Sequence, residues 1–279
     1  MEVPFELIDR FDRDVHHYRV YESDPGSVDW LDQLAEEYVK ILTHREAPLK
    51  SLKINDSDMQ MDVSNIQKYL KKASIPKYKK GNFNVVRSDF GELLCYMLLE
   101  HEYRTLFGAK SISNRELRDS PGRGIDAVGI EVEGDQLTLV LCEVKVSDEQ
   151  PSPPRVVDYN DDCLSKQHRY HLNNLDDATK DKVWRVANKT RDEEVADLLT
   201  IAALYLEAKR LDKLRIIICN VLVRPKKKYT KADFGSFFVK PDQYDPAAIR
   251  FLIACIPDNV DATITQWYDV IQNTEIPVE

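Results

Sequence analysis

The sequence predicts an α/β protein in which a mixed β-sheet is flanked by helices, with a helix-rich N-terminal part. Residues 137–146 form a run that is apolar on both faces, which is typical of an interior strand covered by helices on both sides. Residues 214–223 form a second apolar run, and residues 193–211 before it have the period of an amphipathic helix. A hairpin followed by strand–helix crossovers predicts a mixed sheet.

The N-terminal part, residues 1–84, contains no catalytic constellation. Helical periodicity covers residues 30–39 and 63–73, with a polar, turn-rich segment at 48–62 between them. We expect this part to be a helical, partner-interaction region, and residues 85–279 to form a domain that carries the candidate site. With 279 residues, 43% of them hydrophobic, the chain can bury one large core or two small ones.

A helix is expected to begin at Ser88 or Asp89, because either side chain is a good N-cap. Glu92 heads an otherwise apolar row on this helix, so its carboxylate points toward the body of the fold. A second interpretation is a capping box, in which Glu92 satisfies a free backbone N–H three residues after Asp89. The sequence favours the two interpretations equally.

The run at 137–146 ends in charged residues that share a face with leucines. Alternation along a strand places Glu143 and Lys145 on the same side as Leu139 and Leu141. Burying these charges is costly unless they pair with each other or meet a metal ion. A surface hairpin with a Glu/Lys pair is the alternative, but the surrounding residues are too apolar for it.

Asp126 precedes this strand across an expected hairpin that turns at Gly134-Asp135. Asp126 and Glu143 offer the hard oxygen ligands that suit Mg²⁺, and Mn²⁺ can replace it. Such an ion lowers the pKa of a bound water and offsets the charge that develops on phosphorus in phosphodiester hydrolysis. Lys145 can orient that water or neutralise the transition state. The pattern therefore indicates a metal-dependent nuclease.

An Asp that ends one segment and a Glu-x-Lys on the next strand resemble the signature of the PD-(D/E)xK nuclease superfamily. Pro121 is displaced from the usual Pro-Asp pair. The resemblance implies a restriction-endonuclease-like sheet with catalytic Asp126, Glu143 and Lys145. It also implies that Glu92 reaches the metal site as a catalytic residue and a third metal ligand.

A helical stretch at about 161–175 follows a Pro-rich linker. The resemblance implies a catalytic Gln167 here, followed by the aromatic Tyr170. His168 and His171 lie one turn apart, and we expect them on a solvated helix face, since no third metal ligand stands nearby. The tail is expected to hold strands at 237–239 and 250–256 and a closing helix near 264–271.

The formal net charge of −9 argues against a protein that coats nucleic acid by bulk electrostatics. Local basic segments are candidate nucleic-acid contacts, although each is also explained as a solvated face. These candidates are Lys79, Lys80, Arg123, Lys226, Lys227 and Lys228. The five cysteines are scattered in apolar contexts, which predicts buried free thiols. With no membrane-spanning run and no N-terminal signal segment, we expect a cytoplasmic protein that does not contact a membrane.

The layout of the whole chain resembles the HamA family, the effectors of the Hachiman anti-phage defence system. The resemblance implies a DNA nuclease that is held inactive by a superfamily-2 helicase, HamB, until phage or damaged DNA is sensed. A restriction or repair endonuclease acting alone and a catalytically inactive nuclease-like binding subunit are the alternatives. The sequence leaves the oligomeric state open, with a homodimer as one option.

Overall fold

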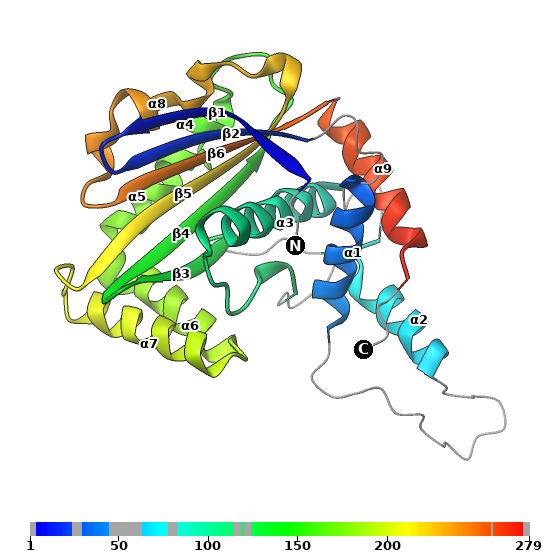
Figure 1. Ribbon diagram of the computed structural model, residues 1–279, viewed down its shortest axis with the longest axis horizontal. Coiled ribbons are helices and arrows are strands. Elements are labelled where there is room, and N and C mark those ends of the chain that lie inside the picture. The colour runs from blue at the N-terminus through cyan, green and yellow to red at the C-terminus, as the bar shows by residue number, and fades with distance from the viewer. Residues whose placement is uncertain are drawn as a thin grey trace.

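A six-stranded mixed sheet forms the centre of the molecule (Figure 1). The computed structural model describes residues 4–23, 30–44, 63–77, 83–113, 119, 124–257 and 259–275. The strands are β1 (Phe5–Arg13), β2 (His16–Ser23), β3 (Ala127–Glu133), β4 (Gln136–Val146), β5 (Leu214–Pro225) and β6 (Ala248–Ile256). Their order across the sheet is β1-β2-β6-β5-β4-β3. The four inner strands are mutually parallel, and β1 and β3 pair antiparallel at the two edges.

Helices cover both faces of this sheet (Figure 1). One layer contains α1 (Trp30–Thr43), α3 (Phe83–Tyr103) and α9 (Val260–Asn273), with α2 (Val63–Ser74) beside α1. The other layer contains α4 (Arg155–Asp158), α5 (Leu164–Asn173), α6 (Lys180–Lys189), α7 (Glu193–Glu207) and α8 (Gly235–Val239). Single-turn segments are η1 (Ser111–Ser113), η2 (Leu175–Thr179), η3 (Lys226–Lys228), η4 (Lys231–Phe234) and η5 (Pro241–Tyr244). The predicted α/β fold with a mixed, helix-flanked sheet is confirmed.

The two faces of β4 divide as the alternation predicts. Leu139 and Leu141 pack into the core beneath α5–α7, whereas Val140 and Cys142 pack into the core beneath α1, α3 and α9. Each face of the strand therefore meets its own apolar layer, and Glu143 is fully buried at the end of the run. The hairpin turn at 134–135 is also confirmed, and Gly134 there has a φ of 58°, a conformation that favours glycine.

The N-terminal part contains α1 and α2, as expected, and it also contributes two strands, β1 and β2, to the sheet. Two other expectations about local structure are wrong. Helix α3 begins at Phe83, so Ser88 and Asp89 lie inside it and do not cap it. Residues 237–239 belong to the short helix α8, because Phe237 turns inward to stack on Tyr244 at a ring-centroid distance of 4.4 Å.

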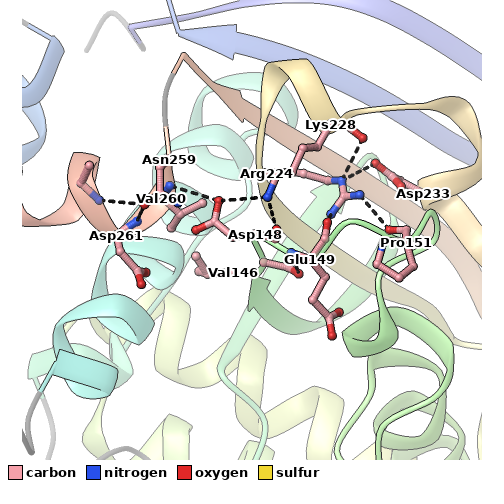
Figure 2. Close-up of polar contacts among 12 residues, drawn as sticks. Val146, Asp148, Glu149, Pro151, Arg224, Lys228, Asp233, Asn259, Val260 and Asp261 are labelled. Carbon is pink, nitrogen blue, oxygen red and sulfur yellow. Dashed lines mark hydrogen bonds and ion pairs between the residues drawn. The ribbon is translucent and has the colours of Figure 1, made fainter.

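A buried ion pair holds the guanidinium group that fastens the segment after β4 (Figure 2). Arg224 Nε lies 2.7 Å from Asp233 Oδ2, and neither side chain is exposed. The same guanidinium donates to the carbonyl oxygens of Glu149 at 3.1 Å and Pro151 at 2.9 Å. These contacts fix the connection between β4 and the helix layer that holds α5.

All five cysteines are free and buried, as predicted. None of the helices in the described part of the chain combines the length and the apolar character that crossing a bilayer requires.

Candidate active site

The β3–β4 hairpin brings Asp126 beside Glu143. Ala127 pairs with Cys142 in the antiparallel register, so the next opposed positions are 126 and 143. The backbone N–H of Val144 donates a 2.8 Å hydrogen bond to Asp126 Oδ2, which fixes that carboxyl group against β4. Asp126 is partly buried and Glu143 fully buried. The two carboxyl groups predicted to share a site therefore do lie together.

Helix α5 presents a histidine to this pair. His171 Nε2 lies 2.7 Å from Glu143 Oε1. The other oxygen, Glu143 Oε2, is buried and has no hydrogen-bond partner in the described residues. His171 is 7% exposed and His168 is fully buried, so the expected solvated helix face is wrong. Spacing along a helix does not specify which side meets the sheet, and here the histidine side does.

Glu92 approaches from α3, in the opposite helix layer. Ser88 Oγ donates to Glu92 Oε1 at 3.3 Å, and the Ser111 hydroxyl lies within hydrogen-bond distance of the other carboxylate oxygen. Ser111 Oγ is also 2.6 Å from the carbonyl oxygen of Asp126, so one hydroxyl connects Glu92 to the site. Because Glu92 lies inside α3, the capping-box interpretation is wrong. Asp89 instead accepts a 2.5 Å hydrogen bond from Tyr38.

The three carboxyl groups share one electrostatic environment. Burial is the largest cause that raises the pKa of Glu92, Asp126 and Glu143, each to about 8. The charge of Asp126 raises the pKa of Glu92 further, and the charge of Glu143 does the same for Asp126. Without a cation, the site therefore favours protons on these groups at neutral pH.

The two further predicted site residues, Lys145 and Gln167, lie on β4 and α5. Lys145 is on the same face as Glu143, with a side chain that is 16% exposed, and its Nζ lies 3.3 Å from Asp162 Oδ2. Gln167 precedes His171 by one turn of α5, and its Oε1 is buried without a hydrogen-bond partner in the described residues. Tyr170 is 56% exposed and points away from this core. Lys145 therefore lies beside Glu143 on β4, and Gln167 lies one turn from the histidine that contacts Glu143.

Lys182 on α6 is a site residue that sequence reasoning missed. A Cβ placed on Gly124 would lie 3.9 Å from Lys182 Nζ, which locates this ammonium beside the segment leading to Asp126. Burial lowers the pKa of Lys182, while the charges of Asp126, Glu92 and Glu143 raise it. The residue lies more than fifty positions after Asp126 in an ordinary basic helix, so only the packing of α6 reveals it.

A divalent ion fits the Asp126–Glu143 pair. Among the residues that the structure describes, no three His, Cys, Asp or Glu side chains form a metal-binding group. Mg²⁺, however, takes only one or two protein carboxylates and keeps several waters. The buried, unpartnered Glu143 Oε2 opposite Asp126 is the kind of oxygen that such an ion would satisfy.

The basic residues predicted to contact nucleic acid differ in their surroundings. Lys79, Lys80 and Arg123 lie outside the described residues. Lys226 forms a 2.7 Å ion pair with Glu22, and Lys228 donates to the carbonyl oxygen of Asp148. Lys227 is exposed. Two of the three lysines after β5 are therefore engaged within the protein itself.

The fold and the site define an α/β protein whose helix-covered sheet carries a buried carboxylate pair next to a lysine. The HamA family model matches residues 5–265, which is nearly the whole chain, and the chain belongs to this family of Hachiman effector nucleases. Searches of the curated proteins and of the solved structures found no match.

Proposed function

We propose that this chain is a Mg²⁺-dependent deoxyribonuclease that serves as the effector of an anti-phage defence complex. The observation that carries the proposal is the buried Asp126–Glu143 pair with Lys145 on the same face, in a member of the HamA family. A buried carboxylate pair costs free energy in a metal-free fold, so a cation-dependent activity explains why the pair is there.

Each residue then has a defined role. Asp126 and Glu143 Oε2 would hold the ion, and the contact from His171 to Oε1 fixes the orientation of the Glu143 carboxylate. When bound, Mg²⁺ would supply a water of lowered pKa and would offset charge on the phosphate. Lys145 orients that water or neutralises the charge on the phosphorane-like transition state. Glu92, connected to Asp126 through the Ser111 hydroxyl, would be a third ligand of the ion.

The proposed partner is the superfamily-2 helicase HamB, which would deliver or gate the DNA. A net charge of −9 weakens sequence-independent binding to DNA and so favours activity that depends on a partner. Mixing the chain with the helicase and phage DNA should change the cleavage rate. Equal cleavage with and without the helicase would favour an endonuclease that acts alone.

Plasmid nicking tests the nuclease proposal. Wild-type chain with Mg²⁺ should convert supercoiled DNA to nicked and linear forms, with EDTA abolishing the reaction. Glu143→Gln and Lys145→Ala should each lower the rate at least a hundredfold. Glu133→Gln, which changes an exposed carboxylate on the same hairpin, is the matched control and should cleave normally. Equal cleavage by Glu143→Gln and the control would reject the site.

A further inference from the structure

Helix α6 carries a row of basic side chains that starts at the candidate active site. Lys182, Arg185 and Lys189 are three and four residues apart, so they lie on one side of the helix. Val183, Val186 and Ala187 lie on the adjacent side of the helix and pack into the core. At a rise of about 1.5 Å per residue, the row extends about 10 Å from Lys182 to Lys189.

Exposure changes along this row. Lys182, at the inner end of the row, is partly buried, and the charges of Asp126 and Glu143 raise its pKa. Arg185 and Lys189 are exposed, and neither forms a hydrogen bond or an ion pair with any residue that the structure describes. The charge of Lys189 lowers the pKa of Lys182, as expected for two cations two helical turns apart on one side of α6. Arg185 and Lys189 therefore place two positive charges, unpaired within the described residues, on the same side of α6 as Lys182 at the acidic site.

We propose that this row, Lys182-Arg185-Lys189, is the surface along which the DNA backbone reaches the active site. Successive phosphates would contact the exposed residues first and Lys182 at the carboxylate pair. Three cations within about 10 Å match the high density of phosphate charge on a nucleic acid. The inference rests on the proposed nuclease function and names a surface that binds the same substrate.

The geometry favours nucleic acid over an acidic protein partner. A protein-binding row could end anywhere on the surface, whereas this one ends where a phosphodiester must lie for cleavage. The row also explains how a chain of net charge −9 can bind DNA, because the three basic side chains lie next to the active site.

DNA binding by an Arg185→Ala/Lys189→Ala variant tests the surface. Fluorescence anisotropy with a labelled duplex is measured in Ca²⁺, which replaces Mg²⁺ to limit cleavage, from 50 to 200 mM salt. Loss of two phosphate contacts predicts that wild type loses about tenfold more affinity than the variant over this range. A Lys209→Ala/Arg210→Ala variant removes the same charge from an exposed turn and should bind like wild type. Calorimetric binding of Mn²⁺ should be unchanged in both variants.

The outcomes separate the surface from the nuclease proposal. An unchanged salt dependence in Arg185→Ala/Lys189→Ala, with wild type binding and cleaving DNA, overturns the surface alone. Equal weakening by the control pair also overturns it, because bulk charge would then explain the effect. Loss of helicase binding with normal DNA binding would assign the row to a protein partner and overturn it too. Absence of DNA binding and cleavage in wild type, with and without helicase, would reject the nuclease function itself.

Discussion

Replacing Glu143 by glutamine should stabilise the metal-free protein at neutral pH. The carboxyl group has a pKa of 4.5 in an ordinary environment and of about 8 in the folded chain, chiefly because it is buried. At pH 7 the unfolded chain releases this proton and the folded chain keeps it. This difference lowers the free energy of unfolding by about 3 kcal/mol relative to a side chain that does not ionise. Glutamine cannot ionise and avoids that cost. The advantage of Glu143→Gln should vanish below pH 4.5, grow with rising pH, and level off above about pH 8.

Urea unfolding in EDTA at several pH values measures this effect. The pKa of Glu143 is higher in the folded chain than in the unfolded chain. The contribution of its protonated carboxyl group to the stability of wild type is therefore fully present below pH 4.5 and is lost as the pH rises through about 8. Mg²⁺ at about 1,000 times its Kd should reverse the order, because a bound ion stabilises wild type by RT ln(1 + [Mg²⁺]/Kd), about 4 kcal/mol at that excess, and the variant gains little. If Glu143→Gln in EDTA is no more stable than wild type at pH 7, the burial argument is refuted.

His171→Asn should lower Mg²⁺ affinity about ten- to a hundredfold, because the Glu143 carboxylate loses its 2.7 Å contact. Isothermal titration calorimetry checks this, and an unchanged affinity would remove His171 from the site. Arg224→Met should cost about 3–5 kcal/mol, since it leaves the buried Asp233 carboxylate unpaired. Urea unfolding measures it, and a loss below about 1 kcal/mol would contradict the ion-pair account. Gly91→Ala should cost about 1–3 kcal/mol, because its Cβ would lie 2.7 Å from Val144 Cγ1. An unchanged melting temperature would show that the Val144 side chain can move to make room for the added methyl group at no cost, which would contradict the prediction.

The sequence predicted the central strand of the site well because its signal is local. Alternation from Leu137 to Val146 determines which side chains share a face, and nothing in the tertiary structure alters that period. The turn at Gly134 then sets the register that opposes Asp126 to Glu143. Two local rules were therefore enough to assemble the carboxylate pair.

Features that depend on packing were missed or misread. Strand β1 is a largely exposed edge strand, so its mixture of charged and apolar residues gave no strong strand signal. Asp89 is a residue type that often caps helices, but here it lies inside α3 and accepts a hydrogen bond from Tyr38 of α1. His171 and Lys182 reach the site only because α5 and α6 pack against the sheet in one particular rotation.

The account depends most on a single divalent ion shared by Asp126 and Glu143. Crystals grown with Mn²⁺ and measured near the manganese absorption edge test this most directly, because anomalous scattering locates the ion without reference to activity. We expect one anomalous peak about 2.1 Å from both Asp126 and Glu143 Oε2. A peak elsewhere, or a fully occupied ion that contacts neither carboxylate, would rule out a shared ion at this pair.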